Sequence, residues 1–428
     1  MIKATNLMQT GISWIPEIPS DWDLKRIKLL FDFNKNIVGK TSANYDVLSL
    51  TTKGVIKRDL ESGFGKFPAS FDGYQIVKPN SIMLCLFDMD VTPRVVGHVD
   101  DNGIISAAYT NIIPKNGINS KYYYYYFLLQ DKNKSLLALG TGIRITLNKD
   151  FFGTLKIPVP PLKTQNRIVE YLDKKNSEID KFIRNKERLI ELLEISKKRK
   201  IFDAITKGIN KNIDLKVSGY AWIGSIPIHW EMKKIKSFAS HIQRGTSPAY
   251  VNESELVVIS QAVISSGYID NTKFKFQAKT RIETLKGRLF KDDVLLASTG
   301  GGALGKSIVF DREGNYIADG HLTIIRDKKR RFNPKFLYYF LSINFDFIEG
   351  YLGQGSTNQT ELQRGWFRDL YLPFPELNEQ NAIVEFINEF NSEISCAISK
   401  AQQEISSIKE YREALITDLV TGKRSVPQ

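Results

Sequence analysis

The sequence has 428 residues, of which 42% are hydrophobic and 25% charged, and this composition excludes a disordered or fibrous chain. Its 60 Lys and Arg residues against 47 Asp and Glu give a net charge of +13, which favours a polyanionic partner such as nucleic acid. Two distant cysteines exclude a disulfide framework, and there is neither a signal-peptide core nor an apolar run of about 18 residues. We therefore expect a cytoplasmic protein with no membrane partner.

The first segment of the chain recurs near its middle. Residues 11–28 read GISWIPEIPSDWDLKRIK, and residues 219–236 read GYAWIGSIPIHWEMKKIK, at a constant offset of 208 positions. Each copy has two tryptophans eight residues apart that flank Ile-Pro, in a chain with only five tryptophans. This match indicates an internal duplication.

The two segments that follow differ in sequence but share a composition typical of α+β domains. Both contain β-branched and aromatic runs broken by turn residues, which predict an irregular, mostly antiparallel sheet. The predicted strands are 46–51, 82–87, 104–109, 256–260, 294–298 and 322–325. Residues 122–129 and 336–343 are expected to form short buried helices. Tyrosines 122 to 126 point all around such a helix, so core packing is favoured over a base-stacking ladder.

A second repeat closes each half. Residues 157–180 match residues 372–395 at an offset of 215, and Gln165 falls on Gln380. Each copy opens with prolines and then lacks Gly and Pro until Gly208 or Gly422, which predicts two helices of about 44 residues, each roughly 66 Å long.

Each predicted helix has one apolar stripe at spacings of 3, 4 and 7, and such a rod needs a partner. The stripe residues are Leu172, Ile179, Ile183, Ile190 and Leu193 in the first helix, and Ile387, Ile394, Ile398, Ile405 and Ile408 in the second. The first helix region (163–207) has a net charge of +5 and the second (376–424) of −4. Antiparallel pairing would bring the late basic run 197–200 beside the early glutamates of the second helix, although a solvated face or a phosphate contact stays open for that run.

Polar loops before the proline segments are candidate DNA contacts. Gly140-Thr-Gly-Ile-Arg-Ile-Thr-Leu aligns with Gly355-Ser-Thr-Asn-Gln-Thr-Glu-Leu, and hydroxyls, amides and arginine are groups that contact phosphate or read base edges. The candidates are Thr141, Arg144, Thr146, Ser356, Asn358 and Gln359, with Arg94 and Arg244 as weaker choices. The alternative is an ordinary polar turn.

Residues 300–307 (GGGALGKS) formally satisfy the phosphate-binding loop pattern of NTPases. That mechanism requires a helix beginning at Lys306-Ser307, but a short β-type run follows. A Gly-rich hairpin on the DNA backbone, with Lys306 at a phosphate, is the favoured interpretation. The four histidines lack metal-ligand spacing, and no methyltransferase motif is present, so no catalytic residue, metal site or cofactor is expected on this chain.

The repeated W-I-P-x-I-P-x-x-W segment, the repeated P-x-P-x-L-x-x-Q-x-x-I-V-E helix start and the Thr-Gly-type endings resemble the DNA-specificity subunit of type I restriction-modification enzymes. In the second copy Gly224 replaces the first Pro. The resemblance covers essentially the whole chain.

This resemblance implies two target-recognition domains, each reading one half of a split double-stranded DNA site, and an antiparallel coiled coil that sets their spacing with pseudo-twofold symmetry. It also implies two methyltransferase subunits that dock on the helices and bind S-adenosylmethionine, with a separate restriction and translocation subunit. The expected segments are 1–157 (first domain), 158–210 (first helix), 211–372 (second domain) and 373–428 (second helix and tail). Two alternatives remain: a P-loop-type nucleotide-binding enzyme, and a coiled-coil interaction scaffold without DNA specificity.

Overall fold

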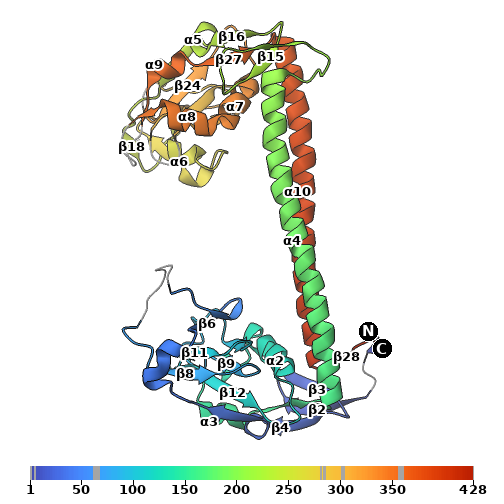
Figure 1. Ribbon diagram of the computed structural model, residues 1–428. Helices are drawn as coiled ribbons and strands as arrows, with labels where there is room; N and C mark the ends of the chain where they lie inside the picture. The colour runs from blue at the N-terminus through green and yellow to red at the C-terminus, as the bar shows by residue number, and fades with distance from the viewer. Residues whose placement is uncertain are drawn as a thin grey trace. The chain divides into compact units, whose positions relative to one another are not determined.

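The computed structural model describes residues 2–3, 6–60, 68–279, 282, 286–299, 304–354 and 361–427. It divides into two compact units, Met1–Lys186 with Gln402–Gln428, and Glu187–Ala401. Each unit contains one α+β domain together with part of two long helices, α4 (Leu162–Lys207) and α10 (Leu377–Val420) (Figure 1). The units thus divide both helices, whereas the boundaries expected from sequence lie at the helix ends and remain a prediction.

The domain of the first unit is built around a four-stranded antiparallel sheet in the order β10-β9-β12-β5. Its strands and helices are β1 (Ile2–Lys3), β2 (Leu7–Ile12), β3 (Ile15–Pro19), β4 (Asp23–Arg26), α1 (Ile27–Leu30), β5 (Phe31–Asn34), β6 (Leu48–Thr51), β7 (Gly54–Lys57), β8 (Tyr74–Val77), β9 (Ile82–Leu84), β10 (Val96–His98), β11 (Gly103–Ser106), β12 (Thr110–Pro114), α2 (Ser120–Lys132), α3 (Lys149–Thr154) and β13 (Lys156–Val159). The C-terminal β28 (Arg424–Ser425) pairs with β1 in the same unit.

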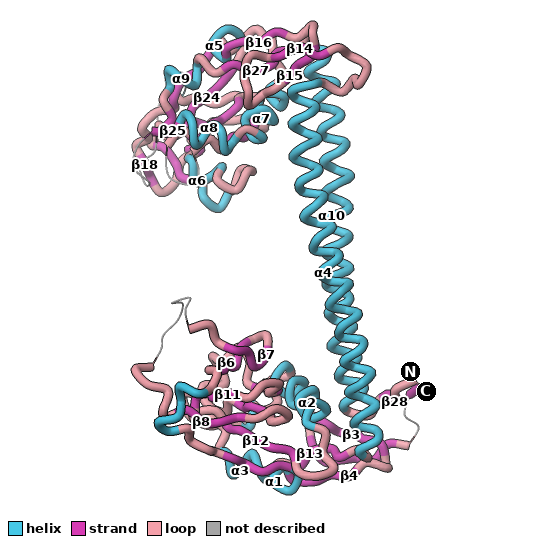
Figure 2. The backbone as a smooth tube through the Cα atoms, in the orientation of Figure 1, coloured by secondary structure: helices cyan, strands magenta, loops and turns pink. Residues whose placement is uncertain are grey.

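The second unit repeats this sheet in the order β22-β21-β24-β17 and adds a second one, β18-β20-β19-β23. Its elements are β14 (Leu215–Val217), β15 (Ser225–Pro227), β16 (Glu231–Lys234), α5 (Ile235–Phe238), β17 (His241–Arg244), β18 (Tyr250–Val251), β19 (Val257–Ile259), α6 (Gln261–Ile264), β20 (Lys275–Gln277), β21 (Val294–Ala297), β22 (Ser307–Val309), β23 (Tyr316–Ala318), β24 (Leu322–Arg326), α7 (Pro334–Ile343), α8 (Phe345–Leu352), β25 (Gly353–Gln354), β26 (Glu361–Leu362), α9 (Arg364–Arg368) and β27 (Tyr371–Phe374). The mixed helix and strand content confirms the α+β prediction (Figure 2).

The strand registers relate the two domains residue by residue. In the first sheet Ile112 lies opposite both Phe33 and Ile82, and in the second Ile325 lies opposite both Ile242 and Val294. Likewise His98 lies opposite Ile82, and Val309 lies opposite Val294. Residues of the two middles therefore occupy equivalent positions although their sequences differ.

Helices α2 and α7 occupy equivalent places and fill the domain cores. Tyr122, Tyr123, Tyr125 and Tyr126 are buried in α2, which confirms their prediction as core residues, while Tyr124 is half-buried. Residues Phe336, Leu337, Phe340 and Leu341 of α7 are buried in the same way.

A glutamine joins each domain to its long helix. Gln165 Oε1 accepts a hydrogen bond from the backbone N–H of Asn119, the N-cap of α2, and its Nε2 donates to the carbonyl of Pro160, both at 2.8 Å. Gln380 makes the same two bonds, from Asn333 N–H and to Pro375, also at 2.8 Å. Both glutamines are buried, so water cannot bind the backbone groups that they contact, and each glutamine supplies the hydrogen bonds that these groups need. We call each glutamine with its two hydrogen bonds the glutamine clip, and it explains why the repeated helix start contains glutamine.

The repeated tryptophans pack against the glycines that end the long helices. Gly208 and Gly422 have left-handed φ angles of +76° and +72°, which favour glycine at a helix end. A Cβ at Gly422 would lie 2.9 Å from the ring of Trp22, and a Cβ at Gly208 would lie 3.3 Å from the ring of Trp230. A Cβ at Gly422 would also lie 2.4 Å from the ring of Pro19, so a larger residue there would force its neighbours to move. The two repeated motifs thus meet at one contact in each unit.

Within each unit α4 and α10 run antiparallel. In the first unit Lys186 pairs with Glu404 at 2.5 Å, and Asp180 pairs with Arg412, so residue numbers rise along α4 as they fall along α10. In the second unit Lys200 Nζ lies 5.4 Å from the Phe386 ring centroid. The predicted antiparallel orientation is confirmed.

The basic residues 197–200 make other contacts than the ion pairs with early α10 glutamates that their charge suggested. Among the described residues no ion pair joins them to the early glutamates of α10; Lys200 lies over the rings of Phe386 and Phe390, and Arg199 pairs with Asp203 of its own helix. An ammonium over an aromatic face gives comparable attraction while the lysine stem covers apolar surface.

The apolar stripes face the helix interface to different extents. Leu172, Ile179, Ile183, Ile387 and Ile394 are buried, whereas Ile190, Leu193, Ile398, Ile405 and Ile408 are half-buried. Leu189, Leu192 and Ile195 of α4 stay exposed, so one further apolar face of this helix is uncovered.

We expect Gln380→Ala to lower the free energy of unfolding by about 1–3 kcal/mol, because it leaves the buried Asn333 N–H and Pro375 carbonyl without partners. Urea unfolding of the whole chain measures the change. Gln402→Ala, an exposed glutamine on the same helix, is the matched control and should cost less than about 0.5 kcal/mol. Equal effects of the two substitutions would show that the clip does not stabilise the domain.

Candidate nucleic-acid interface

Equivalent strand ends carry different side chains in the two domains. Phe87 follows β9 and Tyr109 directly precedes β12 in the first unit, and at the corresponding strand ends of the second unit Thr299 follows β21 and His321 directly precedes β24. The rings of Phe87 and Tyr109 stack with centroids 5.9 Å apart and an interplanar angle of 25°. At the corresponding strand ends of the second domain, Thr299 Oγ1 and His321 Nδ1 form a hydrogen bond of 2.6 Å. We call these positions the strand-end pair of each domain.

The strand-end pairs are accessible and chemically distinct. Phe87, Tyr109 and Thr299 are half-buried, and His321 is exposed. Two stacked rings offer an apolar surface and one hydroxyl, whereas the threonine-histidine pair offers hydrogen-bond donors and acceptors. Apolar groups suit the thymine methyl, and hydrogen-bonding groups suit the other base edges of a major groove.

A hairpin lies beside the strand-end pair of the first domain. Thr141 and Thr146 exchange backbone hydrogen bonds of 3.0 Å in both directions, and Leu147 N–H donates to the carbonyl of Leu86 at 2.8 Å. The Arg144 side chain, 81% exposed, lies at the hairpin tip, and its guanidinium is 3.5 Å from the Asp88 carboxylate. Arg144, Thr141 and Thr146 are thus brought next to Phe87 on one surface.

The second domain has the same connection. Leu362 N–H donates to the carbonyl of Ser298 at 2.8 Å, just before Thr299, which is equivalent to the bond from Leu147 to Leu86. The predicted contacts Ser356, Asn358 and Gln359 lie outside the described residues.

Arg94 and Arg244 both point to internal partners. Arg94 Nε is 3.9 Å from the buried carboxylate of Asp131, and its side chain is 21% exposed. Arg244 pairs with Glu361 at 2.5 Å and is equally shielded. Arg244 is the last residue of β17 and lies opposite Thr323 of β24, two residues after His321.

A strand begins directly after Lys306. Ser307 begins β22, which pairs antiparallel with β21, so the helix that a phosphate-binding loop requires is replaced by a strand. Lys306 Nζ donates to the carbonyl of Ser265 at 3.0 Å. This geometry contradicts the P-loop alternative, and Lys306 holds a neighbouring loop in place.

The strand-end pairs were missed by sequence reasoning. His321 was considered only as a metal ligand, and the two middles have no sequence match that would align Phe87 with Thr299. Only the pairing of β9 with β12 and of β21 with β24 shows that the two pairs lie at corresponding strand ends. Within the described part of the chain no group of three or more His, Cys, Asp or Glu side chains is placed to hold a metal ion. None of the described helices is both long and apolar enough to cross a membrane.

Comparisons with known proteins agree with this architecture. Residues 19–194 and 227–407 match the type I restriction modification DNA specificity domain. The chain is 26% identical over 416 residues to the type I restriction enzyme MjaVIII specificity subunit of Methanocaldococcus jannaschii, covering 95% of this chain and 93% of that protein. It is 24% identical to the putative MjaX specificity subunit of the same organism, covering 98% and 97%.

Solved structures share the fold. One, described as the structural basis underlying complex assembly and conformational transition of the type I R-M system, has a TM-score of 0.72 at 13% identity and covers 95% of this chain and 99% of its own. The HsdS subunit from Thermoanaerobacter tengcongensis has a TM-score of 0.61 at 14% identity and covers 95% and 98%. With two matching domains over most of its length, the chain belongs to the family of type I restriction-modification DNA specificity proteins.

Proposed function

We propose that each target-recognition domain of this specificity subunit reads one half of a bipartite double-stranded DNA site. The paired helices α4 and α10 set the distance between the halves and carry two methyltransferase subunits. This chain supplies no catalytic residue and binds no cofactor; the methyltransferase subunits bind S-adenosylmethionine and flip the target adenine. A restriction subunit would join the same cytoplasmic assembly.

One observation carries this proposal: the same sheet edge presents different chemistry in the two domains. The stacked pair Phe87–Tyr109 and the hydrogen-bonded pair Thr299–His321 lie at corresponding ends of paired strands, after β9 and before β12 in one domain and after β21 and before β24 in the other. A protein that reads two unlike half-sites needs one scaffold with two different sets of base-reading side chains. A scaffold that only bound proteins would have no such requirement.

The charge distribution supports binding to phosphates. The chain has a net charge of +13, whereas the two long helices nearly cancel each other, so the positive excess belongs to the recognition domains and their connections. Lysine and arginine contacts to phosphate supply affinity without sequence preference, and they make binding strongly salt-dependent.

Exchange of one domain tests modular reading. Replacing residues 22–157 with the corresponding domain of another family member should change one half of the methylated sequence and leave the other half and the spacer intact. Methylation mapping of genomic DNA measures this outcome. A change in both halves would contradict independent reading by the two domains, and failure of the unaltered complex to bind any duplex selectively would remove the proposal.

Substitution of the strand-end pair tests its role directly. Thr299→Ala combined with His321→Ala should reduce the discrimination between the cognate second half-site and single-base variants about tenfold, because hydrogen bonds to base edges are lost. Phe87→Ala combined with Tyr109→Ala should do the same for the first half-site only. Relative methylation rates on an oligonucleotide series measure both effects. Unchanged preference in folded variants would show that other residues read the bases.

A further inference from the structure

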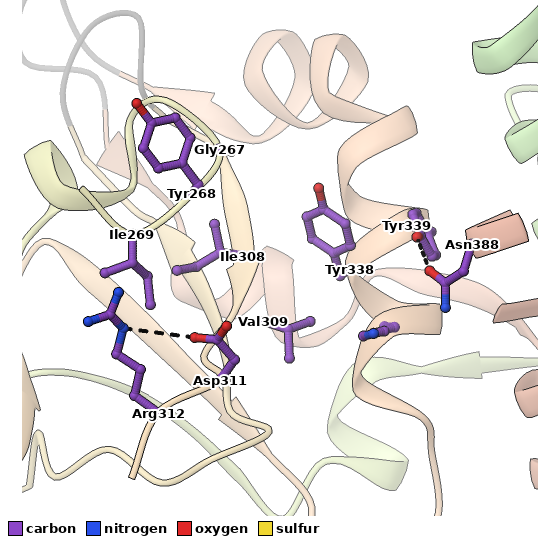
Figure 3. A pocket seen from close by; sticks show the side chains of 11 residues that line it. Gly267, Tyr268, Ile269, Ile308, Val309, Asp311, Arg312, Tyr338, Tyr339 and Asn388 are labelled. Atoms are coloured by element: carbon purple, nitrogen blue, oxygen red, sulfur yellow. Dashed lines mark hydrogen bonds and ion pairs between the residues drawn. The ribbon is translucent and has the colours of Figure 1, made fainter. Parts of the chain in front are cut away.

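A cavity lies where each recognition domain meets its long helix. In the second unit it has a volume of about 400 Å³ and lies between α7, α10 and β22 (Figure 3). In the first unit a cavity of about 160 Å³ lies between α2, α4 and β10. We call these the junction cavities.

The two junction cavities are equivalent. Lys121 and Lys335 each lie two residues after the N-cap asparagine of α2 or α7, and Asp100 and Asp311 each lie two residues after the matched pair His98 and Val309. The residues that line the same positions are Asp100, Lys121, Tyr124, Tyr125 and Asp173 in the first unit, and Asp311, Lys335, Tyr338, Tyr339 and Asn388 in the second. Four of these five positions keep the same residue type although the surrounding domains have diverged.

One of the retained positions has an internal explanation. The Tyr125 hydroxyl donates to Asp173 of α4 at 2.6 Å, and the Tyr339 hydroxyl donates to Asn388 of α10 at 2.7 Å. This tyrosine holds the domain helix against the long helix in both units, so its retention reflects the fold.

The retained lysine and aspartate make different internal contacts in the two units, and the remaining tyrosine differs in part. Lys121 pairs with Asp173 at 3.2 Å, but the neutral Asn388 at the matching place cannot form that ion pair with Lys335. Asp100 accepts from His98 at 2.8 Å, whereas Asp311 faces Arg312 at 4.0 Å. Tyr124 lies against His98, with ring centroids 6.0 Å apart, whereas Tyr338 stands at the cavity opposite Ile308 and Tyr268 (Figure 3). Both tyrosines also contact the ring of the tyrosine that follows them, with centroids 5.5 Å apart for Tyr124–Tyr125 and 5.2 Å apart for Tyr338–Tyr339. Among the described residues no shared internal contact explains why the lysine and the aspartate recur.

We infer that the junction cavities dock the methyltransferase subunit, one copy in each unit, through a polar segment that offers an acceptor to the lysine and a donor to the aspartate. The inference rests on the proposed function for the identity of this partner. A partner that is the same for both halves accounts for residues that stay the same, and the two unlike DNA half-sites do not. The carboxylates of Asp100, Asp173 and Asp311 disfavour a DNA phosphate there.

The test is a charge exchange in the second unit, Lys335→Glu with Asp311→Lys, which leaves the net charge unchanged. Both side chains are exposed at the cavity and neither contributes to the core. Lys329→Glu with Glu313→Lys makes the same exchange at exposed positions outside the cavity and is the matched control. Each full-length chain is titrated with the methyltransferase subunit encoded beside it, and native mass spectrometry and calorimetry give stoichiometry and affinity.

We expect the cavity exchange to weaken one of two methyltransferase binding events at least tenfold, so that chains with a single methyltransferase subunit accumulate, while the control binds two. Tyr338→Phe, which removes only a hydroxyl, should weaken the same event several-fold and serves if the charge exchange impairs folding. Affinity and stoichiometry equal to the control for both variants would overturn the inference and leave DNA selectivity untouched. Weaker binding of duplex DNA by the variant chain alone, with normal methyltransferase stoichiometry, would also overturn it and assign the cavity to the DNA backbone. Failure of the unaltered chain to bind the methyltransferase subunit would instead contradict the proposed function.

Discussion

The antiparallel packing of α4 on α10 is the interaction on which the rest of the structure depends. Neither helix can bury its apolar stripe alone, and buried residues such as Leu172, Ile179, Ile387 and Ile394 show that the pair satisfies this need in both units. Each domain is then fixed to the helices at two further points, the buried glutamine clip and the contact between a tryptophan and a helix-ending glycine. The position of a recognition domain is therefore determined at the helix end, independently of the side chains that its sheet presents.

In this arrangement the contacts that attach a domain to the long helices are separate from the strand-end side chains, so the first can stay constant while the second vary. Attachment contacts recur almost atom for atom: Gln165 and Gln380 make identical bonds, and Asn119 and Asn333 each donate from Nδ2 to an asparagine of the long helix at 2.8 Å. The sheet edge, by contrast, carries stacked rings in one domain and a hydrogen-bonded pair in the other. A duplicated scaffold can thus change the half-site it reads without changing how it is held.

Sequence reasoning predicted the duplication, both long helices, their orientation and the tyrosine-rich core helix, because each depends on periodicity or on repeated text. It could not find the strand-end pairs, since matched strands are displaced by 209 to 213 residues, between the offsets of 208 and 215 that the flanking repeats show. Loops of different length change the offset from strand to strand, and without matching residue types a sequence comparison cannot detect this change. The partners of Lys200 and Lys306 were equally inaccessible, because a lysine pairs with whichever ring or carbonyl the tertiary fold brings near.

On this account the pair of long helices sets the distance between the two DNA half-sites that the recognition domains read. Inserting seven residues into α4 after Ile190 and seven into α10 after Lys400 keeps the heptad phase, so the stripes can still pack. At 1.5 Å per residue the insertion lengthens the pair by about 10 Å, which is about three base pairs of DNA. Mapping the methylated sequence of this variant should give the same two half-sites separated by about three additional base pairs. If the variant methylated DNA with full activity at half-sites separated by the original spacer, this would contradict the claim that the helices set the distance.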